Sequence, residues 1–174
     1  MNDKFVKPVY HDLRRYNKRK LEFIDSEVEK MLKLDIIEPY LGDWSSSVVA
    51  VPKPGPGDEL RFCVDLRDVN EITETVKYPL PNIEDVVHGL GGKAKYFSKL
   101  DAAKGFWQVL IREDCKKYFA FSTRKGTWAF KRMPFGHKNA PGIFQHLMNS
   151  ILHDLLYKEC FVYIDDIIVF GETE

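Results

Sequence analysis

The chain has 174 residues, of which 44% are hydrophobic, a composition that suits one globular domain or two closely packed subdomains. Its 26 basic and 26 acidic residues balance, so net charge alone argues against a nucleic-acid partner, and the distribution of charge becomes the better guide. No apolar run approaches the roughly 20 residues that a membrane-spanning helix needs. The first four residues lack the apolar character of a signal peptide.

The cysteines give a first indication of the compartment. Cys63, Cys115 and Cys160 are far apart in the sequence and odd in number. Their spacing fits neither a zinc site nor a disulfide framework, which indicates a reducing environment. We therefore expect three small side chains that are buried or half-buried.

Positive charge is concentrated in two segments. Residues 1–20 hold seven Lys or Arg against two acids, and their weak patterning predicts a loosely ordered segment. The second segment, residues 115–138, holds no acid and seven basic residues, namely Lys116, Lys117, Arg124, Lys125, Lys131, Arg132 and Lys138. Such a block either neutralises phosphates along a template channel or forms a solvated face. The aromatic residues interleaved with it favour core packing over base stacking.

The first half of the chain predicts a helix, a hairpin and a second helix. Ser26 begins a capping box for a helix that extends to about residue 34. Residues 47–51 and 60–64 are typical of paired strands, and the loop between them is rich in proline and glycine. Residues 82–90 predict a helix that ends at a Gly-Gly pair.

The second half predicts strands on either side of a helix. A strand ending at Asp101 precedes a short helix, and residues 117–122 and 127–132 predict a hairpin. A longer helix begins at residues 139–141, with proline in its first turn. Apolar residues then recur every four positions and predict one buried face, formed by Ile143, Leu147, Ile151 and Leu155. The order of the elements predicts an α+β fold with an antiparallel sheet.

Two adjacent acids interrupt an apolar run near the C-terminus. Asp165 and Asp166 lie between residues that are typical of two short buried strands. Desolvating an unpaired carboxylate costs at least several kcal/mol, so buried acids at this position would need a compensating partner, for which a divalent cation is the usual candidate. The alternative is a polar hairpin turn whose aspartates face water, because Asp is common in turns.

Asp101 provides a third carboxylate. It ends a predicted strand and is followed by small residues, which allow a bulky ligand to approach the backbone. An acid at a strand end, together with an Asp-Asp hairpin, can hold two hard divalent ions on oxygen ligands for phosphoryl transfer. Taken alone, Asp101 could equally be a helix N-cap.

Seven short segments in a fixed order decide between these alternatives. They lie at residues 45–53, 60–70, 78–81, 99–101, 133–136, 139–141 and 163–166. In this order they resemble the reverse transcriptase of gypsy-type LTR retrotransposons and of their retroviral relatives, over residues 28–170. Each segment alone would be weak evidence, but a chance match of all seven is very improbable.

The resemblance implies the fingers and palm of a right-hand polymerase with the thumb missing. The expected fold is α+β, with an antiparallel palm sheet packed on helices. The implied division is a basic N-terminal segment (1–25), fingers (26–77), palm (78–108), a second part of the fingers (109–140) and a palm segment with the Asp-Asp hairpin (141–174).

The resemblance also assigns a catalytic set. Asp101 and Asp165 would bind two Mg²⁺ ions directly, with Mn²⁺ as a possible substitute, and Asp166 would support this metal site. The implied function is that of an RNA-directed DNA polymerase, with two-metal transfer of a nucleotide from a dNTP to a primer 3′-hydroxyl.

Seven further residues are implied to bind the dNTP, namely Lys53, Arg61, Lys104, Gly105, Phe106, Phe135 and Gly136. The Lys and Arg of the fingers hairpin would clamp the triphosphate, since Arg forks two phosphate oxygens and Lys acts as a point charge. Phe106 would stack under the sugar and exclude a 2′-hydroxyl. The backbone N–H groups of residues 104 and 105 would face the triphosphate, and the 135–136 pair would lie beside the incoming nucleotide.

Tyr163 and Ile164 are implied to contact the primer end and the nascent base pair, with core packing as an open alternative for both. His137 replaces an apolar residue of the gypsy-type relatives, and no role follows for it. The expected partners are dNTPs and an RNA or DNA template with its primer, without a membrane. The parent would be a Pol polyprotein with a thumb and RNase H, in the cytoplasm, in virus-like particles or in the nucleus.

One rival function comes from a different class. The chain could be a truncated or co-opted fragment that binds nucleic acid or a protein partner and polymerises nothing. A metal-dependent phosphohydrolase with the same carboxylates is disfavoured, because the sequence offers no residue suited to placing a water molecule.

Overall fold

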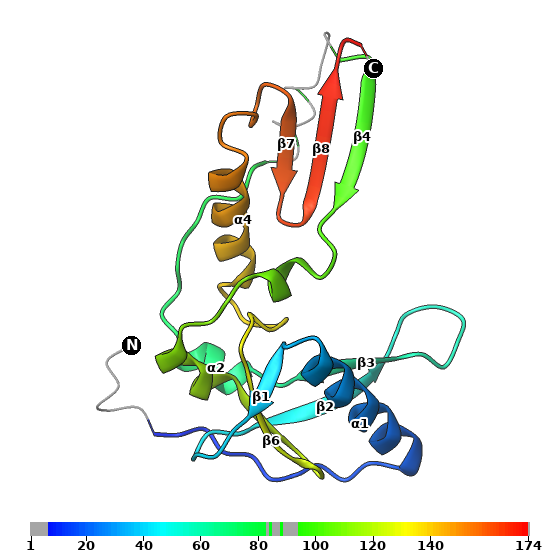
Figure 1. Cartoon of the computed structure of the whole chain (residues 1–174), viewed down its shortest axis with the longest axis vertical. Helices are drawn as coiled ribbons and strands as arrows, with labels where there is room; N and C mark the ends of the chain where they lie inside the picture. The colour runs from blue at the N-terminus through cyan, green and yellow to red at the C-terminus, as the bar shows by residue number, and fades with distance from the viewer. Residues whose placement is uncertain (1–6, 83, 85–87, 89–93, 174) are drawn as a thin grey trace. The chain divides into compact units, whose positions relative to one another are not determined.

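The computed structural model describes residues 7–82, 84, 88 and 94–173, and the chain divides into two compact units. The first unit comprises Met1–Glu74 and Phe106–Lys138, and the second comprises Thr75–Gly105 and Asn139–Glu174. Each unit contains its own β-sheet (Figure 1). The helix predicted over residues 82–90 falls mostly outside the described residues and stays a prediction.

The first unit begins with a long helix, α1 (Lys18–Lys33). The Asn17 side chain caps it by accepting a hydrogen bond from the Lys20 N–H at 3.0 Å. The predicted start at Ser26 was wrong, because Ser26 lies inside the helix and its hydroxyl donates to the Phe23 carbonyl. Ile24, Val28 and Met31 recur at helical spacing and form the buried face of α1.

Five strands form the sheet of the first unit, in the order β1-β6-β5-β2-β3. They are β1 (Ile37–Pro39), β2 (Ser46–Pro52), β3 (Leu60–Val64), β5 (Ala120–Thr123) and β6 (Gly126–Phe130). Within this sheet, β2 and β5 run parallel, and the other neighbouring strands run antiparallel. Both predicted hairpins of this unit are confirmed, although residues 117–119 belong to a 3₁₀ helix, η2 (Glu113–Phe119), and not to a strand. A short helix, α2 (Arg67–Ile72), follows β3.

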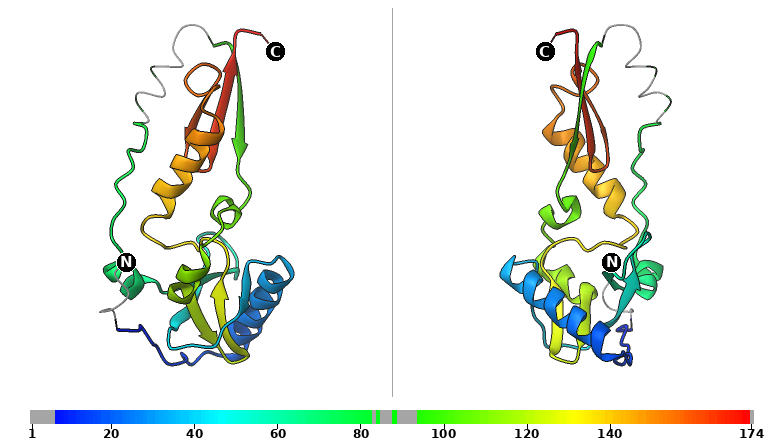
Figure 2. Two further views of the ribbon diagram at one scale, coloured as in Figure 1. Left: turned by 60° about the vertical axis from the view of Figure 1, so that its left-hand side comes forward. Right: turned by 90° about the vertical axis from the view of Figure 1, so that its right-hand side faces the viewer.

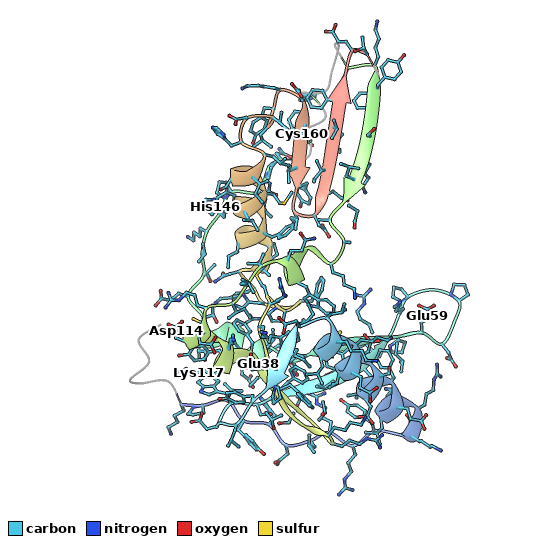
Figure 3. The ribbon with its side chains drawn as sticks, in the orientation of Figure 1. Glu38, Glu59, Asp114, Lys117, His146 and Cys160 are labelled. Carbon is cyan, nitrogen blue, oxygen red and sulfur yellow. The ribbon has the colours of Figure 1, made fainter. Side chains whose placement is uncertain are left out.

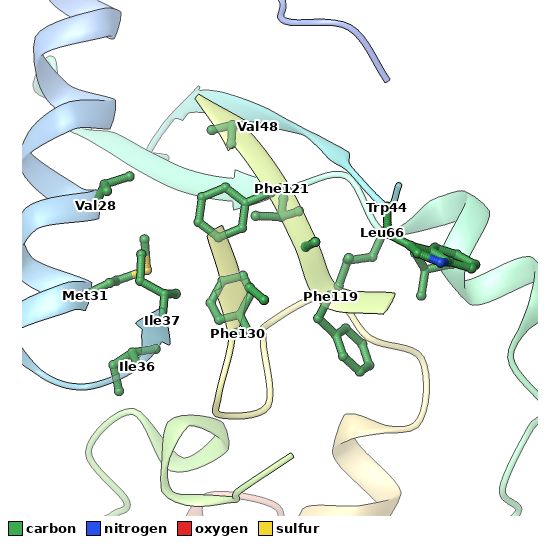
Figure 4. Packing of buried hydrophobic residues seen from close by; sticks show 14 of the residues in the cluster. Val28, Met31, Ile36, Ile37, Trp44, Val48, Leu66, Phe119, Phe121 and Phe130 are labelled. Carbon is green, nitrogen blue, oxygen red and sulfur yellow. The ribbon is translucent and has the colours of Figure 1, made fainter. Parts of the chain in front are cut away.

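Aromatic side chains fill the core between α1 and this sheet. Phe121 has no exposed surface, and Figure 4 shows its ring beside that of Phe130. Its ring centroid lies 5.2 Å from that of Phe130 and 5.6 Å from that of Phe62. Tyr118 and Phe119 are also buried. The aromatic residues interleaved with the basic block therefore pack in the core, as predicted.

The second unit contains a three-stranded antiparallel sheet in the order β4-β8-β7. Its strands are β4 (Tyr96–Asp101), β7 (Cys160–Tyr163) and β8 (Asp166–Gly171). The helix α4 (Ala140–Ile151) begins with proline in its first turn and packs against β7 (Figures 1 and 2). The predicted strand ending at Asp101 and the predicted Asp-Asp hairpin are both present, and a short 3₁₀ helix, η1 (Gly105–Gln108), follows β4.

The buried face of α4 differs from the predicted one. Ile151 is 65% exposed, and Leu155 lies beyond the end of the helix. The buried residues are instead Ala140, Phe144 and Gln145. The reason is that hydrophobic periodicity cannot recognise a polar side chain whose hydrogen bonds are all made inside the protein. Among the helices of the described residues, none has the length and apolar character needed to cross a bilayer.

Candidate functional site

The three predicted aspartates lie at one end of the sheet in the second unit. Asp101, the last residue of β4, is the cross-strand partner of Asp166, the first residue of β8. Asp166 is also paired with Tyr163 of β7, so Ile164 and Asp165 form a two-residue turn. The Ala102 N–H donates to the Asp165 carbonyl at 2.9 Å and ties the end of β4 to this turn.

These carboxylates are accessible to water. Asp101 and Asp165 are exposed, and the Asp166 side chain retains 40% of its surface. The expectation of desolvated acids was therefore wrong, because strand ends and a tight turn lie at the edge of the sheet where solvent reaches them. A cation at this site would be favoured by the clustering of negative charge and not by burial of the carboxylates.

Lys99 is a member of the site that the sequence reasoning missed. Its Nζ lies 3.0 Å from Asp166 Oδ1. The hydrogen bond to Asp166 and the charge of Asp166, with smaller effects from the charges of Asp101 and Asp165, raise the pKa of the Lys99 ammonium. Lys99 stands two residues before Asp101, and side chains two apart in a strand share a face of the sheet. Strand alternation could therefore have identified it.

The donor chemistry of the site fits a hard divalent cation. Mg²⁺ prefers carboxylate, phosphate and water oxygens, and the three aspartates offer only oxygen ligands. The Lys99 ammonium forms an ion pair with Asp166, so this edge of the sheet attracts positive charge. Within residues 7–82, 84, 88 and 94–173, no group of three or more acidic, His or Cys side chains is arranged to hold a metal ion.

In the first unit, the β2–β3 hairpin carries the two residues predicted to clamp a triphosphate. Arg61 is exposed and is the cross-strand partner of Val51. Lys53 follows two residues later, and its backbone N–H donates to the Glu59 carbonyl at 2.8 Å. The Lys53 ammonium also donates to the Glu59 carboxylate at 2.7 Å. Figure 3 labels Glu59 on the loop of this hairpin. Lys53 is thus engaged by an acid of its own hairpin.

A second group in the first unit contains Phe106, Phe135 and Gly136. The rings of Phe106 and Phe135 lie 5.1 Å apart between centroids, and Phe135 is 51% exposed. Gly136 has φ +92°, a conformation that favours glycine. The Asn70 side chain fixes this turn, since its Nδ2 donates to the Gly136 carbonyl and its Oδ1 accepts from the Lys138 N–H. Asn70 is a supporting residue that sequence reasoning did not single out.

The segment after Asp101 differs in part from expectation. Lys104 has φ 52°, in the left-handed region, and is exposed. The Gly105 N–H donates to the Ala102 carbonyl at 2.9 Å, so it is already satisfied inside the chain and is not presented to a ligand. Gly105 itself is buried against Phe144.

Most charges of the basic block are neutralised within the first unit. Lys116 contacts Glu38 and Glu113, with N–O distances of 2.9 and 2.6 Å. Lys131 lies 2.5 Å from Asp35. Arg124 and Lys125 likewise form ion pairs with acids of α1, namely Asp25 and Glu29. These pairs engage all four residues with acids of the same unit, which argues against a continuous channel that neutralises phosphates.

Comparison with known proteins gives the family. The family model described as reverse transcriptase (RNA-dependent DNA polymerase) matches residues 51–174. The chain belongs to the reverse transcriptase family. This reverse transcriptase domain is 41% identical, over 153 residues, to the retrovirus-related Pol polyprotein from transposon 297 of Drosophila melanogaster, a match that covers 86% of this chain. It is 36% identical, over 157 residues, to the corresponding polyprotein from transposon gypsy of the same organism, covering 88% of this chain.

The reverse transcriptase domain spans 14% of the first polyprotein and 15% of the second. Among solved structures, it is similar to the foamy viral protease-reverse transcriptase in complex with an RNA/DNA hybrid, with a TM-score of 0.82 and 24% identity. That match covers 97% of this chain and 22% of the viral one. The likeness confirms the predicted α+β fold with an antiparallel sheet.

Proposed function

We propose that this chain is an RNA-directed DNA polymerase domain that adds deoxynucleotides to a primer. The observation that carries the proposal is the cross-strand pairing of Asp101 with Asp166, which brings two acids of the family set together with Asp165 in the adjoining turn. The family membership supports the reaction class, and the exposure of Asp101 and Asp165 leaves them accessible to a substrate.

The carboxylates would act through divalent cations. Asp101 and Asp165 would hold two Mg²⁺ ions, which when bound lower the pKa of the primer 3′-hydroxyl and neutralise charge on the triphosphate. Asp166 would keep its contact with Lys99 or exchange it for a cation. The Lys99 ammonium balances part of the negative charge of the three acids and thereby reduces their mutual repulsion.

Residues of the first unit would contribute to nucleotide recognition. Arg61 is exposed on the β2–β3 hairpin and can fork two phosphate oxygens. The Lys53 ammonium would have to break its ion pair with Glu59 to reach a phosphate. Glu59 would therefore weaken the binding of phosphate by Lys53. Phe106 packs against Phe135, and this contact supports a rigid ring that excludes a ribose 2′-hydroxyl. We infer that the template is RNA or DNA, in line with the RNA/DNA hybrid bound by the foamy viral relative.

The test is deoxynucleotide incorporation on a short RNA template with a DNA primer, in Mg²⁺ and in EDTA. We expect incorporation that requires the metal and disappears in Asp165→Asn. The matched control is Asp154→Asn, an identical change at an acid of the same unit that is 87% exposed. Incorporation that survives Asp165→Asn would overturn the proposal. A folded protein that binds primer–template at low salt but incorporates nothing would favour the binding-fragment alternative.

Sugar selectivity gives a separate test of Phe106. A Phe106→Val change removes the ring and should raise incorporation of ribonucleotides relative to deoxynucleotides. Phe119→Val, at a buried ring of the same unit, is the control for general loss of packing, and it should lower stability without changing the ratio of the two substrates.

A further inference from the structure

A buried glutamine contacts the hairpin that carries Asp165 and Asp166. Gln145 of α4 has no exposed surface. Its Oε1 accepts a hydrogen bond from the Ile164 N–H at 2.7 Å, and its Nε2 donates to the Val162 carbonyl at 3.1 Å. One side-chain amide therefore holds the backbone on both sides of Tyr163, directly before the turn.

The geometry resembles that of a neighbouring strand. β7 is an edge strand of the three-stranded sheet, so its outer N–H and C=O groups lack a strand partner. In an extended strand, the C=O of residue 162 and the N–H of residue 164 point to the same side. The oxygen of a primary amide and the N–H on the same side of it can bind two such groups together, as the N–H and C=O of a single strand residue do, and the second N–H stays available for another acceptor. Gln145 thus pairs with the end of β7 as a short strand would.

The turn itself needs such support. Ile164 has φ 57°, a left-handed conformation that is unfavourable for a β-branched residue. Conformations of this kind persist only when surrounding contacts hold them in place. The bond from the Ile164 N–H to Gln145 is one contact that fixes this residue, and Asp165 follows it immediately.

Two further side chains fix the glutamine. Gln145 Nε2 donates to Asn149 Oδ1 at 2.8 Å, and Asn149 Nδ2 donates to the Tyr78 hydroxyl at 2.9 Å. The Tyr78 ring also packs against His146, which Figure 3 places on α4. All of these residues belong to the second unit, so the whole chain of contacts lies within one compact body.

We propose that Gln145 is a positioning residue for the catalytic hairpin, with Asn149 and Tyr78 as the supports that orient its amide. The part of this proposal that concerns catalysis depends on the proposed polymerase function. The part that concerns the hairpin does not. The hydrogen bonds of Gln145 to the hairpin end on backbone atoms of residues 162 and 164, so its effect on the reaction would pass through the positions of Asp165 and Asp166.

The first experiment measures amide hydrogen exchange in the full chain. In Gln145→Leu, which keeps the approximate volume but removes the amide, exchange at Ile164 should accelerate by roughly tenfold or more. Exchange at Ile143, whose N–H donates to the Asn139 carbonyl, reports on α4 itself and should change little. Ser150→Ala is the control, because this exposed hydroxyl donates only to the His146 carbonyl of its own helix. Unchanged exchange at Ile164, or an equal acceleration at Ile143, would overturn the proposal.

If Gln145→Leu fails to fold, a variant with a smaller structural change tests the same contacts. Tyr78→Phe removes only the hydroxyl that accepts from Asn149 and keeps the ring contact with His146. It should accelerate exchange at Ile164 in the same direction but by less than Gln145→Leu. A Tyr78→Phe protein with exchange at Ile164 identical to that of the wild type would refute the role assigned to Asn149 and Tyr78.

The second experiment measures steady-state incorporation. Changes to groups that orient metal ligands typically cost about 10–100-fold in activity. We expect kcat of Gln145→Leu to fall by that factor, with little change in the KM for dNTP, because the glutamine touches no substrate. A rise in KM alone would contradict a positioning role. If the wild type incorporates nothing, the proposed function fails, while the exchange experiment still decides the role of Gln145.

Discussion

The backbone of Gly105 lies directly against the ring of Phe144. A β-carbon at residue 105 would stand 2.8 Å from Phe144 Cζ, closer than real Cβ contacts allow. Phe144 is 1% exposed and has little room to move. Gly105→Ala should therefore lower the free energy of unfolding by about 1–3 kcal/mol, the usual cost of overpacking a core.

Chemical denaturation checks this prediction. The double variant Gly105→Ala/Phe144→Leu should recover part of the loss, because the smaller side chain makes room for the added methyl group. A denaturation midpoint of Gly105→Ala equal to that of the wild type would show that this contact relaxes without cost.

The burial of His137 leads us to expect that the folded state loses stability in acid. Its ring is 8% exposed and meets the Phe119 ring edge to face, and neither ring nitrogen has a hydrogen-bond partner among the described residues. Burial, and then the charge of Lys138, lowers the pKa of His137 below its ordinary value of 6.5. The unfolded chain therefore takes up a proton first, so stability is complete above pH 6.5 and falls as the pH drops below it.

His137→Leu should reduce this pH dependence and raise Tm at pH 5 relative to the wild type. Thermal unfolding of both proteins at pH 5 and pH 8 measures the change in Tm with pH. His153→Gln, at a histidine whose side chain is 76% exposed, is the control and should leave the difference between the two pH values nearly unchanged. An equal pH dependence in His137→Leu and in the wild type would show that His137 is not its source.

The ion pair of Asp65 leads us to expect a second loss of folding stability, at a lower pH. The Arg67 guanidinium makes two hydrogen bonds to its carboxylate, at 2.8 and 2.7 Å, and this contact lowers the pKa of Asp65 from 3.8 to about 2. Because the folded pKa is the lower one, the stabilisation is complete above pH 3.8 and is lost as the pH falls toward 2.

Arg67→Met should flatten the stability profile in this range, measured by denaturation between pH 2 and pH 5. Arg15→Met, at an exposed arginine of the same unit, should leave the profile as in the wild type. If the Arg67 and Arg15 variants gave the same profile, Arg67 would not be the partner that lowers the pKa of Asp65.

Phe121 should be among the most sensitive positions of the core. It has no exposed surface and packs against the rings of Phe62 and Phe130. Phe121→Ala should cost about 3–5 kcal/mol, the sum of lost transfer energy and cavity formation. Leu41→Ala, at a fully exposed leucine, should change stability by less than about 0.5 kcal/mol. Urea denaturation with similar midpoints for the two variants would contradict this account of the core.

Local patterns predicted much of the second unit. The strand that ends at Asp101 and the turn at Asp165 are marked by residues that are neighbours in the sequence, so strand propensity and turn chemistry identify them. The same reasoning failed on α4, where Ile151 is exposed and Gln145 is buried. A polar side chain can be buried when its partners are in place, and those partners, Val162 and Ile164, belong to another element.

The sequence by itself determined the family and the α+β class, and it predicted a site at Asp101, Asp165 and Asp166, because these depend on residue types and on short spacings along the chain. The tertiary structure alone decided the pairing of Asp101 with Asp166, the contact between Lys99 and Asp166, and the neutralisation of Arg124 by Asp25. Arg124 and Asp25 are 99 positions apart in sequence. Contacts of that range arise only when strand register and helix packing bring distant residues together, and no local pattern encodes them.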